Sequence, residues 1–210
     1  MKKIIFSFLF FLSSFITLHA HPHMAIYYSC DFHFEEGELN GAWINFAFDR
    51  FFSVDITSTY DMDSDGNFNK EEAKEIYNHA FINLENYGFF ISIRDDDGRT
   101  SPDKVSDFHP YLDDEEMLNY RFYITLKENT KREFYLSVYD PTFFCATYMV
   151  EEAPVSVNSD LPVQSSYTIE ENTNYPVYYD PLAPASDTRS YDEWRPGLNT
   201  YFPEEIHFVY

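Results

Sequence analysis

The stretch DMDSDGNFNKEE occupies residues 61–72 and carries Asp or Asn at every second position from its first residue to its ninth. Gly66 stands at the sixth position, where the chain turns sharply, and a glutamate closes the stretch. Ca²⁺ takes about six to eight oxygen ligands, and an EF-hand loop supplies them with this spacing. A solvated acidic turn is the simpler alternative, but the glycine, the apolar Phe68 and the closing glutamate together favour calcium. The predicted calcium ligands are Asp61, Asp63, Asp65, Asn67 through its carbonyl, Asn69 and Glu72.

Helices are predicted on both sides of this loop. Asp49 precedes RFFSVDITSTY as a helix N-cap, so a short helix is expected to lead into the loop. Asn69 and Glu72 have the spacing of a capping box at the start of a second helix. Apolar residues then recur at helical spacing over residues 73–87, and Gly88 is expected to end the run.

The amino terminus has the pattern of an export signal. Lys2 and Lys3 precede an apolar run over residues 4–18, and Ala20 is a small residue suited to cleavage. A membrane anchor is the alternative, but the run is shorter than the ~20 apolar residues that a transmembrane helix needs. We therefore expect a signal peptide over residues 1–20, a mature chain that begins at His21, and no insertion into the membrane after cleavage.

The composition is strongly acidic and rich in aromatic residues. The chain has 36 acidic and 14 basic residues, a formal net charge of −22, and loss of the two leader lysines makes it more negative. This charge repels nucleic acid and anionic membranes and favours cations. With 22 Phe and 18 Tyr the chain is too aromatic for a disordered acidic protein. Residues 21–210 are expected to form one domain with a substantial core.

Strand signals place this domain in the α+β class, as an antiparallel β-sheet domain with one EF-hand-like helix-loop-helix insertion. In the first predicted strand, apolar residues alternate with polar ones and form one face. Asp97-Gly98 has the composition of a hairpin turn, and another turn is expected around Asn129-Thr130. The predicted strands are residues 25–34, 43–48, 89–94, 119–127, 134–139, 143–150 and 205–210.

Residues 153–199 are predicted to be a long Pro- and Tyr-rich loop region, because repeated prolines exclude a helix and most central strands. The chain has two cysteines, Cys30 and Cys145. In an oxidising compartment they can form a disulfide bridge, whereas the apolar face that carries Cys30 favours buried thiols. The sequence leaves this choice open, as it does the oligomeric state.

Further candidate metal ligands are histidines and one Asp-Pro motif. His21 and His23 stand at the predicted mature terminus, where imidazoles can bind zinc, copper or nickel, although a frayed tail is the simpler interpretation. Asp140 opens an Asp-Pro turn within YDPTFF, residues 139–144. Four other histidines are scattered, and His109 is expected in a loop before a proline. The sequence has no catalytic motif such as HExxH, CxxC or a phosphate-binding glycine loop, so we do not expect an enzyme.

The order of these motifs is that of a known family. A leader followed by HPH, a strand hairpin, Phe-Asp at 48–49, the DxDxDG loop and YDPTFF resemble the bacterial exported family catalogued as domain of unknown function 1007. The resemblance covers nearly all of the mature chain. It implies a periplasmic accessory of a zinc, nickel or cobalt transport system that works with a membrane transporter. On this chain it implies transition-metal ligands at His21 and His23, with Asp49 and Asp140 as neighbours.

Two functions are therefore predicted as alternatives. In the first, the protein captures a transition metal (zinc, nickel, cobalt or copper) with its terminal histidines and delivers it to a transporter, while calcium in the 61–72 loop is structural. In the second, the protein is a calcium-stabilised binding module with no transition-metal role, and its Tyr-rich segment contacts another envelope protein or a glycan.

Overall fold

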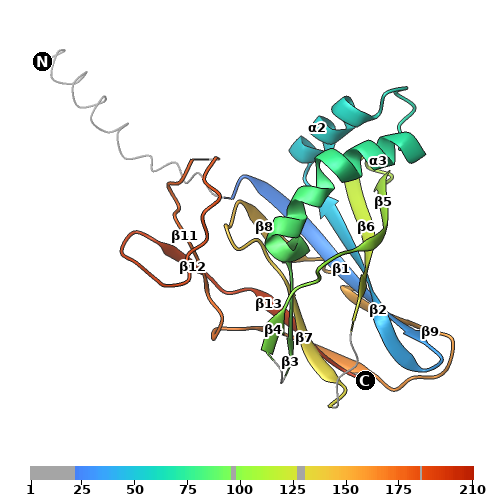
Figure 1. The fold of residues 1–210 in the computed structure, drawn as a ribbon, viewed down its shortest axis with the longest axis vertical. Helices are drawn as coiled ribbons and strands as arrows, with labels where there is room; N and C mark the ends of the chain where they lie inside the picture. The colour runs from blue at the N-terminus through green and yellow to red at the C-terminus, as the bar shows by residue number, and fades with distance from the viewer. Residues whose placement is uncertain (1–21, 96–97, 127–130, 185) are drawn as a thin grey trace, which may run out of the picture.

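Two β-sheets that face each other form the centre of the computed structural model, which describes residues 22–95, 98–126, 131–184 and 186–210 (Figure 1). The predicted signal peptide, His21 and the turn at Asn129-Thr130 lie outside these residues. Within these ranges, no helix has the length and apolar character needed to cross a membrane.

The first sheet is built around its long hairpin, β1 and β2. Its strand order is β5-β6-β2-β1-β8, and β9 also pairs with β1. The β8 and β9 strands follow one another along the same edge of β1, both parallel to it. The strands are β1 (Met24–Glu35), β2 (Glu38–Phe48), β5 (Ser106–Leu112), β6 (Leu118–Thr125), β8 (Cys145–Met149) and β9 (Val155–Ser159).

Alternation in β1 determines which face of this sheet is buried, as the sequence predicted for residues 25–34. The inward side chains are at most 2% exposed, while Tyr27 between them is 45% exposed. Burial of each such side chain contributes roughly 1.5–3 kcal/mol relative to exposure. The inward residues of β1 are Ile26, Tyr28, Cys30, Phe32 and Phe34.

The second sheet covers the buried face of the first. Its strand order is β10-β13-β7-β3-β4, with all pairs antiparallel. Phe32 of β1 contacts Phe208 and Phe134 of this sheet, with ring centroids 4.0 Å and 5.5 Å apart. The strands are β3 (Ile91–Asp95), β4 (Gly98–Thr100), β7 (Glu133–Val138), β10 (Ser166–Glu171) and β13 (Glu204–Val209).

The helices lie together at one end of the first sheet (Figure 1). They are α2 (Arg50–Tyr60) and α3 (Lys70–His79), followed by the 3₁₀ segment η2 (Phe81–Phe90). The prediction of one helix through residue 87 was therefore wrong. The Asn83 side-chain amide donates to the carbonyls of His79 and Ala80, which competes with continuation of the α-helix. The tighter segment that follows buries its first residue, Phe81.

The α+β class is confirmed, but residues 153–199 are not one loop. They contain β9, β10 and β11 (Val177–Tyr179), and β11 pairs with β12 (Asn199–Tyr201) in a separate two-stranded sheet. The prolines of this region lie outside these strands, and β10 is an edge strand of the second sheet. His109, predicted in a loop, lies in β5, another edge strand that accommodates the following proline.

The register of β1 excludes a disulfide between Cys30 and Cys145. Cys145 lies opposite Met24, and Cys30 is farther along the same strand, so the two Cα atoms are separated by roughly 20 Å. A disulfide needs Cα atoms within about 7 Å. Both thiols are buried, and burial raises the pKa of each above its ordinary value of 9.0. The charge of Asp140 and a hydrogen bond to it raise the pKa of Cys145 further.

We expect native protein at pH 8 to react with neither Ellman's reagent nor iodoacetamide, because the raised pKa values leave almost no thiolate and both sulfurs are covered. In concentrated guanidinium chloride without reductant both thiols should react. Electrophoretic mobility should be the same with and without reductant. A native chain that lacks titratable thiols after unfolding would contradict this register.

Candidate metal centre

The acidic loop is held at both ends by helix caps. Asp61 is the C-cap of α2, and its N–H donates to the Thr57 carbonyl at 3.0 Å. Asn69 is the N-cap of α3, and its side-chain oxygen accepts the N–H groups of Glu71 and Glu72. Both N-caps predicted from the sequence, Asp49 and Asn69, are confirmed. The loop is therefore anchored between two helices.

Three aspartates of the loop converge. Asp61, Asp63 and Asp65 each present one carboxylate oxygen within 4.8 Å of the other two. The Asp61 carboxylate accepts the N–H groups of Asp65 and Gly66 at 3.2 Å and 3.0 Å, which folds the loop back on itself. Gly66 has φ +79°, a conformation that a side chain disfavours. The predicted spacing thus produces a convergent set of oxygens.

The Glu72 carboxylate closes the loop by accepting backbone N–H groups of other loop residues. Its side chain is 1% exposed, and its two oxygens accept the N–H groups of Met62 and Asn69 at 2.7 Å and 2.9 Å. The bond to Asn69 completes the predicted capping box. Each carboxylate oxygen has two lone pairs, so these bonds leave acceptor capacity toward the loop. Glu72 is not part of the converging aspartate set.

The loop concentrates negative charge. Partial loss of hydration, together with the charges of Asp65 and Glu72, raises the pKa of Asp63 above its ordinary 3.8. The ionised carboxylates therefore destabilise one another in the folded loop. A divalent cation among them would remove this repulsion.

A second group of predicted residues meets at the start of β1. His23 is exposed, and its N–H donates to the Phe144 carbonyl at 2.8 Å, with the two rings 5.0 Å apart. Ala25, the second residue of β1, donates its N–H to the Asp49 carboxylate at 2.8 Å. His23, Asp49 and Phe144 of YDPTFF, far apart in sequence, therefore lie near one another in the fold.

Both aspartates of this group bind backbone donors. Asp49 accepts the N–H groups of Phe51 and Phe52 as well as that of β1. Asp140 is 3% exposed and accepts the N–H and hydroxyl of Thr142 and the N–H of Cys145. Their metal role stays a prediction. Among the described residues, only the loop aspartates form a converging set of at least three acidic, His or Cys side chains.

The remaining histidines are dispersed. The contacts given for each are with tyrosine or glutamate side chains and not with another histidine. His33 contacts Tyr123, His79 contacts Glu75, His109 contacts Tyr111, and His207 contacts Tyr135 and Glu133. Sequence reasoning missed a buried ion pair between Arg94 and Glu205, whose Nη2 and Oε2 atoms are 2.7 Å apart. The only sequence signal was an acidic residue within the predicted terminal strand.

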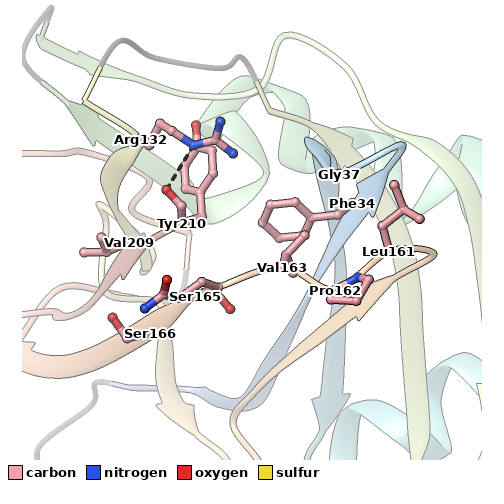
Figure 2. A pocket seen from close by; sticks show the side chains of 11 residues that line it. Phe34, Gly37, Arg132, Leu161, Pro162, Val163, Ser165, Ser166, Val209 and Tyr210 are labelled. Atoms are coloured by element: carbon pink, nitrogen blue, oxygen red, sulfur yellow. Dashed lines mark hydrogen bonds between the residues drawn. The ribbon is translucent and has the colours of Figure 1, made fainter.

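A hollow of about 550 Å³ lies where the edges of the two main sheets meet (Figure 2). Phe34 of β1 and Val209 of β13 contribute apolar surface, and Val163 comes from the connection between β9 and β10. Its one cationic side chain, Arg132, donates from Nε to the Tyr210 carbonyl at 3.1 Å and pairs with Glu38 at 3.5 Å. These contacts direct Arg132 toward the protein itself.

These observations define an acidic α+β protein of two facing sheets, with an aspartate-rich loop between two helices. The chain belongs to the family described as Protein of unknown function (DUF1007), whose model matches residues 6–210. The family membership expected from HPH and YDPTFF is thus confirmed. Comparison with curated proteins and with solved structures gives no match.

The contacts of Asp49 predict that Asp49→Ala lowers the free energy of unfolding by about 1–2 kcal/mol, because it removes an N-cap and a bond to β1. Asp49→Asn should retain most of this stability, since Asn is an equally good N-cap. Urea unfolding of both variants measures the difference. If Asp49→Asn unfolds as readily as Asp49→Ala, the carboxylate charge matters more than the cap.

Proposed function

We propose that this chain is an exported metal-binding accessory protein of a zinc, nickel or cobalt transport system, stabilised by Ca²⁺ in the 61–72 loop. The convergence of three aspartates in a helix-bounded loop is the observation that carries the proposal. The chain's membership of the DUF1007 family, whose resemblance implies export and metal transport, supports the transport part of the proposal. In this proposal the protein works in the periplasm beside a membrane transporter.

Calcium is assigned to the loop on chemical grounds. The set offers carboxylate, amide and carbonyl oxygens and no sulfur or imidazole, which suits a hard cation. The buried Glu72 lies at the end of the loop where an EF-hand supplies its bidentate ligand. Extracellular EF-hand-type modules bind Ca²⁺ at about 10⁻⁴–10⁻³ M, which suits a permanent structural ion rather than a signal.

We expect 10 mM Ca²⁺ to stabilise the mature protein by about 1.4–2.7 kcal/mol for such an affinity, because the ion binds only the folded loop. Thermal unfolding in Ca²⁺ and in EGTA measures this shift. Asp63→Asn with Asp65→Asn should abolish it. Asp114→Asn with Glu115→Gln removes the same charge from an exposed turn and serves as the matched control.

Superimposable melting curves in chelator and in calcium would contradict the calcium assignment. If the control pair also abolishes the calcium-dependent shift in thermal unfolding, the shift is caused by general charge screening.

The transition-metal site is assigned to the start of β1. His23 is exposed there, its backbone is bonded to Phe144, and His21 precedes it by two residues. Imidazole nitrogens suit zinc, nickel, cobalt and copper, and the acidic surface raises the local concentration of cations. Asp49 accepts the N–H of Ala25, two residues after His23, and Asp140 accepts the N–H of Cys145, next to Phe144, so both aspartates fix the backbone around this site.

Calorimetric titration of protein that begins at His21 tests this site. We expect His21→Ala with His23→Ala to weaken binding of Zn²⁺, Ni²⁺, Co²⁺ or Cu²⁺ at least tenfold, about 1.4 kcal/mol, because both imidazoles are lost. His33→Ala with His109→Ala is the matched control, since both residues lie on the first sheet. Unchanged affinity for all four ions in the terminal variant would refute the assignment.

A binding module without a transition-metal role is the second candidate. It is favoured by apolar side chains exposed between residues 175 and 198, where Leu182 is 73% and Trp194 56% exposed. Exposed aromatic residues of this kind are enriched at interfaces. Envelope partners retained by the metal-free protein and lost with Leu182→Ser and Trp194→Ser would support this candidate.

A further inference from the structure

A second pocket, of about 500 Å³, lies between β4, the end of β7 and the segment that contains β11. Arg99 and Tyr139 line it from the side of the second sheet, and Asn174, Tyr175 and Asp192 from the covering segment. This volume is within the range of small-molecule sites, about 300–1,000 Å³. The pocket shares no residue with the 61–72 loop or with the start of β1.

The position of Arg99 is set by its neighbours. Its Nε donates to the Ser92 hydroxyl, and its guanidinium carbon lies 5.1 Å from the ring centroid of Tyr139 and 4.9 Å from that of Tyr175. Such cation–π contacts hold a guanidinium without consuming its N–H donors. In the part of the chain that the structure describes, no hydrogen bond engages the two Nη groups, which can donate at the pocket.

Arg99 differs from its cross-strand neighbour, Arg94. The Arg94 charge is matched by the buried Glu205, whereas Arg99 has no carboxylate at ion-pair distance among the residues that the structure describes. Like charges directly opposite each other in a sheet are destabilising. In a chain with a net charge of −22, an arginine in this arrangement is better explained by a ligand contact than by the stability of the fold.

The lining of the pocket limits what can bind. One cation and one carboxylate, Arg99 and Asp192, balance each other, while Asn174 and Ser190 add amide and hydroxyl groups. The net negative charge of the protein disfavours anions, and Arg99 disfavours cations. Polar groups around tyrosine rings are poorly matched to a purely apolar molecule. A neutral molecule with many hydroxyls and a flat C–H face fits all of these properties.

We propose that this pocket binds a neutral saccharide. The sugar ring lies against Tyr175, and its hydroxyls accept from Arg99 and donate to Asp192 and Asn174. The aromatic character of the covering segment, unexplained by metal binding, is then part of a recognition site. The proposal is independent of calcium and transition-metal binding.

Calorimetric titration of the calcium-loaded mature protein tests this site with three probes: maltotriose, the trimer of N-acetylglucosamine and the trimer of galacturonic acid. At least one neutral trimer should bind with a dissociation constant of about 1 mM or tighter. Arg99→Gln and Tyr175→Ala should each weaken it at least tenfold. Arg189→Gln, an arginine of the same segment outside the pocket, should leave it unchanged.

Binding of the galacturonate trimer alone, or of no probe, would overturn the proposal. Neutral-trimer binding that survives both pocket variants would overturn it too, because the sugar would then bind elsewhere. Arg99 is exposed, so Arg99→Gln decides the matter even if Tyr175→Ala fails to fold, and its melting temperature provides the check on folding.

Discussion

Phe32 of β1 packs against Phe208 of the opposite sheet, with ring centroids 4.0 Å apart, and the rest of the structure depends on this contact between the sheets. It forms only if every second residue of β1 faces inward, and a slip of one residue would expose the whole apolar set. The same strand pairs with β2 on one edge and with β8 and β9 on the other. The register of β1 therefore determines which side chains fill the interior. It also determines how the sheet edges near His23 and near the hollow at Phe34 are built.

An acidic chain can form such an apolar interior only if every buried carboxylate has partners, because an unpaired buried charge is very costly. Among the described residues, three carboxylates are buried. Glu72 and Asp140 accept backbone N–H bonds, and Glu205 binds Arg94 and Asn172. The other acidic side chains in the described ranges keep some contact with solvent, where their repulsion is screened. The loop aspartates also accept backbone N–H bonds, but no cationic side chain is paired with them among the described residues, which is why a cation there would change the stability of the fold.

Local features could be predicted from the sequence, and long-range ones could not. The alternation of β1 and the caps at Asp49 and Asn69 depend on residues within a few positions of one another. The early end of α3 depends on tertiary packing of Phe81 as well as on Asn83. Strands β9 and β10 lack a strong pattern because they pair at sheet edges, and their partners are distant in sequence. Arg99 becomes a candidate ligand-binding residue only when Tyr175 is brought over it.

The two aspartates of the family motifs hold the backbone at one corner of the fold. Asp49 ties the end of β2 to the start of β1, and Asp140 forms the turn into β8, so both carboxylates build the corner at which His23 lies. A carboxylate that accepts three donors has little acceptor capacity left for a metal. Asp49 and Asp140 therefore have a structural role at this corner, and under the proposed function the histidines rather than these aspartates would bind the transition metal. Under the same proposal, calcium in the acidic loop, at the other end of α2, would act on the stability of the fold.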